Sequence, residues 1–419
     1  MHTNIKPTVL VLAHFYLPGT MAGGPIRSIS NLVDNLADIF KFKIVTADRD
    51  FGDKFPYKNI ETNKWVKIGN AQVYYFYPTF RNLLGIAQLL RSTECSFIYL
   101  NSFFDPRFSF WVLLMSWVGY IHKPLLLAPR GEFSPAALNI KSFKKNLYLS
   151  CLKKLGILKS VVWQASSTLE RLDINRALTG GSGQIDINFS MCNKVRVASD
   201  MVEQMPNIFI SRNLTFAGKI LIPKPNARIS SNKKLRICFA SRISRMKNLD
   251  YALKILSRVR SDVIFNIYGP LENLDYWHEC KELIEKLPQN IEVNVLGAYK
   301  NEDIEMIFGA NDILFLPTQG ENFGHVIFEA LKFGLPALIS DRTLWVDFEI
   351  NKAGWIGSLS QPDYFVAVIE RLAKMSIDEL LDFRKGAVDY ARNYMQNNAA
   401  LNETKQLFYY MLTLNSPGL

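Results

Sequence analysis

Two carboxylates stand eight positions apart in the stretch Leu316–Asp341, which reads LPTQGENFGHVIFEALKFGLPALISD. Glu321 falls in a polar loop after an apolar strand, and Glu329 falls about one turn into a helix expected to begin near His325. Carboxylates so placed can accept hydrogen bonds from the hydroxyls of a sugar on one side and of a ribose on the other. The alternative interpretation is a capped helix that binds no ligand.

The same loop carries Gly320 and Gly324, and the helix that follows is expected to end at Gly334. Glycine lets backbone N–H groups approach a ligand closely, and a helix N-terminus favours a phosphate or a hydroxyl-rich group. Loops at the carboxyl ends of parallel strands are where open α/β sheets bind ligands. The pattern therefore predicts a ligand-binding loop between strand and helix.

Strands and helices are predicted to alternate along the chain, and they position this loop. The strands fall into two series, because 419 residues are too many for one ordinary core. The strands predicted for the first series are Thr8–Ala13, Phe42–Thr46, Val73–Phe76, Phe97–Leu100, Leu125–Ala128 and Val161–Gln164. Those predicted for the second series are Leu235–Ala240, Val263–Tyr268, Val293–Leu296, Ile313–Leu316 and Ala337–Ser340. We therefore predict an α/β protein with one domain over 1–205, a linker over 206–232, a second domain over 233–385 and a returning C-terminal helix over 386–419.

Composition narrows the partners of the chain. A formal net charge of +11 favours anionic partners, but no arginine-rich tract or nucleic-acid motif is present, so we expect no nucleic acid. The five cysteines are scattered without a C-x-x-C pair, which indicates reduced thiols rather than disulfides or a zinc site. The short apolar run Val9–Ala13 is typical of a strand rather than a signal peptide, so we expect a cytoplasmic protein.

The frame G-E-N-F-G-x-V-x-x-E-A-L with its two glutamates resembles the donor-binding signature of the retaining GT-B glycosyltransferases, group 1 (family 4). The resemblance implies two Rossmann-like, doubly wound domains that face a central cleft. It also implies transfer of a sugar from a nucleotide-diphosphate donor held by the second domain. It assigns a catalytic role to Glu321, which would position the sugar hydroxyls, and ribose binding to Glu329. The remaining donor-binding residues that it implies in this frame are Asn322, Phe323 and Gly324.

A second segment, LRICFASRISRMKNL over Leu235–Leu249, is similar to the opening of the C-terminal domain in that family. The resemblance implies that Arg242 and Lys247 clamp the donor diphosphate. Two fixed cations in a strand-to-helix loop would neutralise the charge that grows on the leaving diphosphate. The alternative is two surface cations on a basic protein.

Weaker similarities extend the resemblance. Gly23 and Gly24 lie in the loop PGTMAGGPIRS after the first strand, where the family brings glycines to the donor phosphates. This loop is not G-x-G-x-x-G, so a nicotinamide-binding domain is disfavoured. The segment VNVLGAY over Val293–Tyr299 resembles a strand end that borders the nucleotide base, and Tyr299 is therefore assigned to donor binding.

The acceptor side departs from the family pattern. Many members place a histidine after the fourth or fifth strand of the first domain, whereas the loop here reads Pro-Arg-Gly-Glu. We assign Arg130 and Glu132 to the catalytic site near the transferred sugar. His14 is expected to end a strand rather than to act as an acid or base.

No cofactor other than the donor is expected, and no metal site. Asp48-Arg49-Asp50 resembles the Asp-x-Asp metal motif of glycosyltransferases of the other main fold, but that fold does not match this chain. An Asp-x-Asp at a strand end is also common. We expect a reaction that does not require a metal ion.

Two segments bear on membranes. The apolar run Phe108–Ile121 is shorter than the roughly 20 residues of a spanning helix, which leaves a buried helix or an interfacial one. The segment 139–160 carries six lysines among apolar residues. It could rest on anionic lipid at the inner face of the cell membrane, or be a solvated helix face.

Together these observations predict a retaining glycosyltransferase that acts on a glycan or polyprenyl-linked acceptor. The resemblance points to the biosynthesis of a surface polysaccharide, such as an exopolysaccharide, O-antigen or capsule. Two alternatives remain: a sugar-nucleotide epimerase of the same fold, and a non-catalytic relative that binds glycan or lipid.

Overall fold

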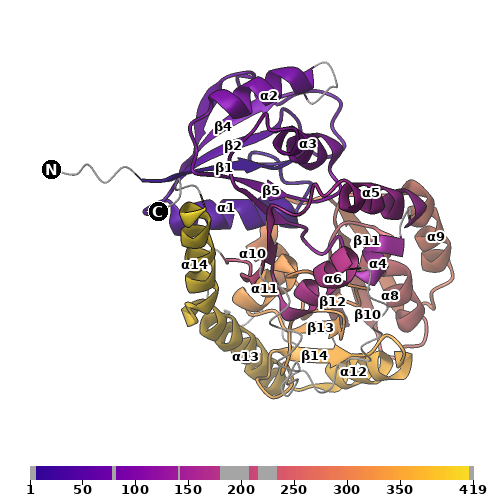
Figure 1. Ribbon diagram of the computed structural model, residues 1–419. Helices are drawn as coiled ribbons and strands as arrows, with labels where there is room; N and C mark the ends of the chain where they lie inside the picture. Colours follow the sequence, from indigo (N-terminus) through magenta and orange to yellow (C-terminus); the bar gives the residue numbers. More distant parts are fainter. Residues whose placement is uncertain (1–5, 78–81, 140–141, 180–206, 216–233, 415–419) are drawn as a thin grey trace. The chain divides into compact units, whose positions relative to one another are not determined.

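The computed structural model describes residues 6–77, 82–139, 142–179, 207–215 and 234–414, and it divides the chain into two compact units (Figure 1). The first unit comprises Met1–Phe216 together with Asn398–Leu419, and the second comprises Ala217–Asn397. Each unit contains one sheet dominated by parallel strands. The predicted α/β class is therefore confirmed.

The sheet of the first unit has eight strands in the order β3-β4-β2-β1-β5-β6-β7-β8. The strands are β1 (Thr8–Leu12), β2 (Lys41–Ala47), β3 (Trp65–Ile68), β4 (Ala71–Phe76), β5 (Phe97–Asn101), β6 (Leu125–Ala128), β7 (Val161–Ala165) and β8 (Ile208–Ile210). All neighbours pair in parallel except β3 and β4, which are antiparallel. Helices connect the parallel strands that follow one another in the chain, except that β2 reaches β4 through β3.

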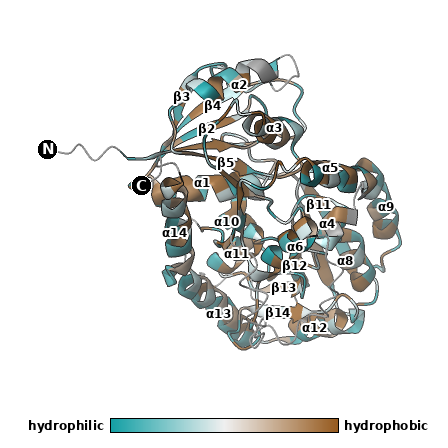
Figure 2. Ribbon diagram, viewed as in Figure 1, coloured by the Kyte–Doolittle hydropathy of each residue, from teal (hydrophilic) through white to brown (hydrophobic). Residues whose placement is uncertain are grey.

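The central strands of this sheet are buried on both faces, which explains their continuous apolar runs. In β1, Val9 and Val11 join one core cluster while Leu10 and Leu12 join another, because successive side chains point to opposite faces. These strands are brown in Figure 2.

In the described residues the α-helices of this unit are α1 (Gly24–Leu36), α2 (Leu83–Ser92), α3 (Trp111–Trp117), α4 (Pro135–Asn139), α5 (Ser142–Lys154), α6 (Thr168–Thr179) and α14 (Ala399–Thr413).

The last helix, α14, returns to the first unit and closes one of its cores. Phe408 is fully buried, with its ring centroid 5.3 Å from that of Phe40 and 5.1 Å from that of Phe97. A hydroxyl pair, Ser211 and Thr404 at 2.9 Å, joins α14 to the residue that follows β8. The C-terminal residues are thus part of the first fold rather than an appendage.

The sheet of the second unit has six strands in the order β11-β10-β9-β12-β13-β14, all parallel. The strands are β9 (Leu235–Ala240), β10 (Val263–Tyr268), β11 (Ile291–Gly297), β12 (Ile313–Leu316), β13 (Ala337–Ser340) and β14 (Gly354–Gly357). The helices are α8 (Leu249–Leu256), α9 (Leu274–Glu285), α10 (Ile304–Gly309), α11 (His325–Lys332), α12 (Pro362–Lys374) and α13 (Ile377–Gln396).

Three strands, β3, β8 and β14, and one helix break were not predicted. β14 contains two glycines, and a Cβ at Gly354 would lie 2.0 Å from the carbonyl oxygen of Ala337, so the close strand contact needs glycine. β8 lies inside the predicted linker and pairs with β7, whereas linker residues 216–232 are outside the described part of the chain. The helix expected over 377–412 is interrupted at 397–398, and the chain enters the first unit after residue 397 rather than at 386.

The apolar segment 108–121 is helical as far as Trp117, and five of its fourteen side chains are buried. Phe108, Val112 and Leu113 are buried, while Trp117 and Val118 at the end of α3 are half exposed. Within the described ranges no helix is both long enough and apolar enough to cross a membrane.

Each sheet contains one position at which the strand order reverses. In the first sheet the reversal lies between β1 and β5, and in the second it lies between β9 and β12. Connections leave the sheet in opposite directions on the two sides of such a position, which opens a crevice at the carboxyl ends of the strands. The residues after these four strands are therefore the first place to look for a ligand site.

Replacement of Phe408 by alanine should destabilise the first unit by about 3–5 kcal/mol, because it removes a fully buried aromatic ring. Thermal and urea unfolding followed by circular dichroism would measure the loss. Gln406→Ala, an exposed substitution on the same helix, is the matched control. Equal stability of the two variants would show that α14 does not contribute to the core.

Candidate functional site

The loops after β9 and β12 are joined into one structure at the reversal of the second sheet. The carbonyl oxygen of Met246 accepts hydrogen bonds from the Thr318 hydroxyl at 2.9 Å and from the backbone N–H of Gln319 at 2.8 Å. The amide of Asn248, a residue with left-handed backbone geometry, donates to the carbonyl oxygen of Pro317 at 2.9 Å. Residues that lie about 70 positions apart in sequence are therefore held side by side.

These bonds bring together two residues that the sequence assigned to a donor site. The ammonium group of Lys247 forms an ion pair with the carboxylate of Glu321. Their side chains are only 13% and 11% exposed, so the pair lies largely out of solvent. In such surroundings a charge interaction is stronger than in water, and loss of one partner leaves a costly unpaired charge.

The second predicted cation, Arg242, also has a carboxylate partner. Its guanidinium lies 3.1 Å from the carboxylate of Glu272, and both side chains are about one third exposed. This more exposed pair is the weaker of the two, since solvent screens it. Both cations at this edge are thus balanced by carboxylates that a diphosphate could replace as partner.

Phe323 anchors the loop between β12 and α11 to the core of its domain. Its ring is buried against Trp345, with 5.2 Å between centroids, and its carbonyl oxygen accepts a hydrogen bond of 2.8 Å from the indole N–H. The ring of Phe323 belongs to the core, so only the backbone of this residue could fill its predicted donor-binding role. Asn322 beside it is partly exposed.

Gly324 is the residue on which the helix start depends. It has left-handed backbone geometry, with φ of 75°, and caps α11. A Cβ there would lie 2.8 Å from Cδ1 of Ile327 and 3.2 Å from Nε1 of Trp345. Glycine is therefore required by both conformation and space.

The other two predicted donor residues of this domain lie on neighbouring elements. Glu329 is partly exposed on α11, and its charge acts on Lys332 one turn later. Burial lowers the pKa of Lys332, while Glu329 raises it. Tyr299 follows β11 and packs edge-on against Tyr268 at the end of β10, with 6.2 Å between ring centroids.

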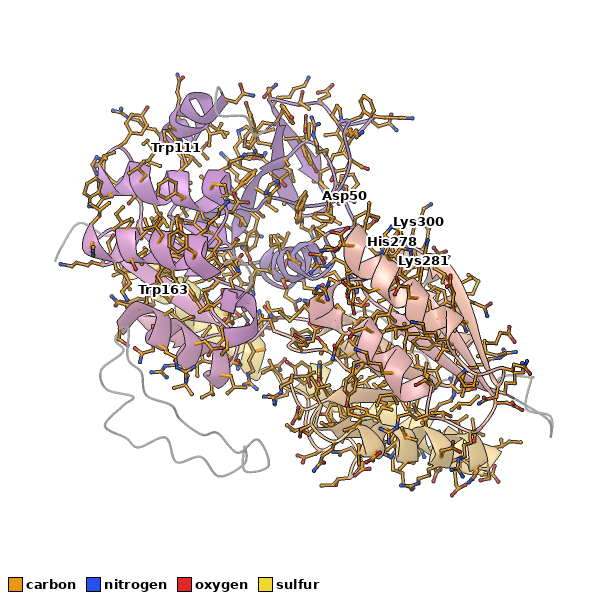
Figure 3. All side chains as sticks on the ribbon, turned by 90° about the vertical axis from the view of Figure 1, so that its right-hand side faces the viewer. Asp50, Trp111, Trp163, His278, Lys281 and Lys300 are labelled. Carbon is orange, nitrogen blue, oxygen red and sulfur yellow. The ribbon has the colours of Figure 1, made fainter. Side chains whose placement is uncertain are left out.

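In the first domain, Asp50 organises the glycine-containing loop after β1. Its carboxylate accepts hydrogen bonds from the backbone N–H groups of Thr20 at 2.6 Å and Met21 at 3.0 Å (Asp50 is labelled in Figure 3). Gly23 caps α1 with φ of 66°, and Gly24 is the first residue of that helix. Asp50 is thus a structural anchor for the predicted donor loop.

The two carboxylates of the Asp-x-Asp sequence have separate partners in the protein. Asp48 forms an ion pair of 2.8 Å with Arg49, while Asp50 is occupied by backbone N–H groups. Among the residues that the structure describes, no three His, Cys, Asp or Glu side chains are grouped so that they could hold a metal ion.

Arg130 lies in the loop after β6, with left-handed backbone geometry at φ of 57°. Its guanidinium donates to the Asn101 side chain at 2.9 Å, to the Tyr99 hydroxyl at 2.6 Å and to the Asn213 side chain. All three partners are neutral, and in the described ranges no carboxylate forms an ion pair with Arg130. The amide nitrogen of Asn101 is itself buried without a hydrogen-bond partner there. This cluster can accommodate an anionic or hydroxyl-bearing group.

The carboxylate of Glu132 holds a neighbouring turn of the backbone in place. It accepts hydrogen bonds from the Ser102 hydroxyl at 2.7 Å and from the backbone N–H groups of Phe103 and Phe104. Burial raises the pKa of this carboxyl group, and these hydrogen bonds oppose the rise. The predicted catalytic role of Glu132 stays a prediction, and its contacts show that it shapes the turn after β5.

Sequence reasoning missed a histidine–carboxylate pair at the reversal of the first sheet. Nδ1 of His14, after β1, lies 2.7 Å from the carboxylate of Asp105, after β5. Asp105 also accepts from the backbone N–H groups of Arg107 and Phe108. Burial raises the pKa of Asp105, but the bond to His14 and the backbone bonds outweigh it, and the net shift is downward.

This pair can bind a hydroxyl or take its proton. Hydrogen bonding of Nδ1 to a carboxylate fixes the tautomer of His14, so that Nε2 is presented for an outside partner. The His14 side chain is 35% exposed. The signal in the sequence was the presence of polar residues after two apolar strands that a doubly wound sheet makes neighbours.

Comparison with known families places a match on the second domain. Residues 223–394 match the model of the family described as Glycosyl transferases group 1. The match covers both segments that resemble the donor site, from Arg242 to Glu329.

One curated relative gives a partial match. An uncharacterized 41.2 kDa protein in the cps region of Klebsiella pneumoniae is 27% identical over 188 residues. The match covers 45% of this chain and 49% of that relative, so the chain matches about half of the relative's length.

Solved structures match almost the whole chain. Sucrose-phosphate synthase from Thermosynechococcus elongatus has a TM-score of 0.68 at 13% identity, covering 98% of this chain and 100% of that one. HepE from Anabaena, solved with UDP-glucose, has a TM-score of 0.63 at 15% identity, covering 97% and 100%. At these identities the likeness shows a common fold, and the predicted GT-B fold is confirmed.

Gly324→Ala should destabilise the second domain by about 1–2 kcal/mol, since a side chain in left-handed geometry is strained. The loss would be measured by thermal unfolding of the purified protein. Gly320→Ala is the control, because the nearest atom to its added Cβ is Sδ of Met246 at 3.7 Å. Equal destabilisation by the two substitutions would contradict a special role for Gly324.

Proposed function

We propose that this chain transfers a sugar from a nucleotide-diphosphate donor to a glycan or lipid-linked sugar, because residues 223–394 match the group 1 glycosyltransferase model and the chain has the GT-B fold. The observation that carries the proposal is the contact of Lys247 with Glu321 at the reversal of the second sheet. A cation for a diphosphate and a carboxylate for sugar hydroxyls lie side by side there. A structural neighbour, HepE, was solved with UDP-glucose, which supports a nucleotide sugar as donor.

On the donor side, Lys247 and Arg242 would bind the diphosphate in place of their carboxylate partners. Their charges would stabilise the negative charge that develops on the leaving diphosphate. Glu321, released from Lys247, would accept hydrogen bonds from the sugar hydroxyls, and Glu329 from the ribose. Tyr299 would border the base. Following the family resemblance, we assign Gly23 and Gly24 to the phosphates.

We propose that the anomeric configuration is retained without a covalent enzyme intermediate. The bond from the anomeric carbon to the phosphate oxygen breaks, and a bond to the acceptor oxygen forms on the same face. The acceptor proton passes to the leaving phosphate. A second course, in which the configuration inverts, requires a base on the opposite face of the sugar, and the pair of His14 with Asp105 is the candidate for that base.

On the acceptor side, Arg130 would lie near the transferred sugar, because it presents a cation balanced only by neutral groups. We propose that the acceptor belongs to a surface polysaccharide and is polyprenyl-linked or a free glycan, and that the enzyme works in the cytoplasm. The cps-region relative and a structural neighbour described as a lipopolysaccharide outer core galactosyltransferase support this proposal. We propose no metal requirement.

A thermal-shift screen against UDP, GDP, ADP, CMP and dTDP, with and without magnesium, should identify one stabilising nucleotide. At 100 times its dissociation constant a ligand stabilises the native state by about 2.7 kcal/mol.

Glu329→Ala should reduce the affinity for that nucleotide at least tenfold, since the ribose hydroxyl, buried in the complex, would lose its acceptor. Glu282→Ala, an exposed glutamate of the same domain, is the control. Unchanged affinity in Glu329→Ala would remove the ribose assignment.

Glu321→Gln should lower the rate of sugar transfer at least a hundredfold while the nucleoside diphosphate still binds. Transfer from the donor to acceptor glycans, followed by mass spectrometry, measures the rate, and NMR of the product reads the anomeric configuration. A retained configuration supports the leaving phosphate as the proton acceptor, and an inverted one supports His14.

Deuterium incorporation from D₂O into the donor sugar without acceptor would point to an epimerase instead. A wild-type protein that binds but never transfers would be a non-catalytic relative.

A further inference from the structure

The outer face of α5 is an apolar stripe in contact with solvent. Phe143, Leu147, Cys151 and Leu155 follow one another at intervals of four residues, which places them on one side of the helix. The backbone N–H of Leu155 still donates to the carbonyl oxygen of Cys151, so the helical pattern reaches Leu155. Phe143 is 81% exposed, and Leu147 and Leu155 are 55% and 52% exposed. We call these four residues the α5 stripe.

The opposite face of α5 already supplies the contacts that hold the helix in the domain. Leu149 and Leu152 are buried, and the ring of Tyr148 lies 5.3 Å from Phe103 and 5.5 Å from Phe110. The α5 stripe is therefore not needed for the core of its own domain. A contiguous exposed apolar surface of this kind indicates an interaction site.

The charged residues of the segment that contains α5 all have one sign. Residues 139–160 include six lysines and no Asp or Glu. Two of these lysines are turned to the protein, since Lys145 donates to the carbonyl oxygen of Ala137 at 2.6 Å and Lys153 to that of Ala177 at 3.0 Å. The ribbon of α5 accordingly carries both hydrophilic and hydrophobic colours in Figure 2.

Lys141 lies outside the described residues, and the three remaining lysines of this segment are available to an outside partner. Lys144, Lys154 and Lys159 are exposed, and none of them forms an ion pair with a carboxylate of the described residues. Long lysine side chains can lie along apolar surface while the ammonium group reaches a polar layer. An apolar stripe flanked by unpaired cations matches the boundary between acyl chains and anionic headgroups.

We propose that the α5 stripe and its three lysines form a surface by which the enzyme lies on an anionic lipid membrane. Phe143 and Leu147 would enter the upper acyl region, and the lysines would reach the headgroup phosphates. A second copy of the chain is a poorer occupant, because a net charge of +11 repels another copy and one helix face is smaller than a stable dimer interface. The proposal rests on the proposed function only in that a lipid-linked acceptor would be found at such a surface.

The test is sedimentation of the full chain with vesicles of phosphatidylcholine containing 30% phosphatidylglycerol, compared with phosphatidylcholine alone. The wild-type chain should bind the anionic vesicles and be released by 0.5 M salt. The triple variant Lys144→Ser, Lys154→Ser, Lys159→Ser should bind about a hundredfold more weakly, since each lysine near the surface contributes roughly fivefold. Phe143→Ser with Leu147→Ser should weaken binding at least tenfold without a change in charge.

The matched control removes the same charge elsewhere. Lys286, Lys374 and Lys385 are exposed lysines of the second domain, and their replacement by serine should leave vesicle binding within twofold of wild type. Circular dichroism of each variant checks that it folds. A control triple that weakens binding as much as the α5 triple would show that net charge, not this surface, attracts the membrane.

Two further results would overturn the proposal. One is a wild-type chain that does not sediment with anionic vesicles at low salt, and the other is undiminished binding by the Phe143, Leu147 variant. Nucleotide binding by the same samples keeps this test separate from the proposed function. An α5 variant that loses vesicles and keeps the nucleotide supports both proposals, whereas vesicle binding by a chain that binds no nucleotide supports the membrane surface alone.

Discussion

Lys247 and Glu321 meet although 74 positions separate them, because β9 and β12 are neighbours at the reversal of the second sheet. The two loops are held together by the hydrogen bonds that the carbonyl oxygen of Met246 accepts from Thr318 and Gln319. The low exposure of the ion pair makes the charges strong and makes each one depend on the other. In the proposed function a nucleotide sugar takes the place of this pairing, with its diphosphate on Lys247 and its hydroxyls on Glu321.

The first sheet repeats the same constraint with different residues. Its strand order reverses between β1 and β5, and His14 and Asp105 follow those two strands. Arg130 follows β6, the next strand, and is held by neutral groups. Each domain therefore carries its own polar groups after the strands of its sheet: cations and carboxylates in the second, and an imidazole–carboxylate pair and a cation in the first. The proposed function uses those of the second domain for the donor and those of the first for the acceptor.

Most of the fold could be predicted from sequence because the strands of a parallel sheet are buried on both faces and read as apolar runs, as in Leu235–Ala240. The strand β14 was missed because its glycines suggest a loop, and only the approach of Ala337 explains them. The proposed donor residues could be named from sequence because they stand close together in two motifs, and their roles stay predictions. Pairings across the sheet were not visible: neither the partner of His14 nor the backbone contacts of Glu132 follow from local sequence.

In the proposed site Lys247 binds the donor diphosphate, and Glu321 is its partner only while the site is empty. Isothermal titration of the nucleoside diphosphate into wild type, Lys247→Met and Glu321→Gln tests this assignment. We expect at least tenfold weaker binding in Lys247→Met, because a charge-assisted contact is lost. We expect unchanged or tighter binding in Glu321→Gln, because Lys247 no longer has to leave a carboxylate. Wild-type affinity in Lys247→Met would rule out Lys247 as a ligand of the diphosphate.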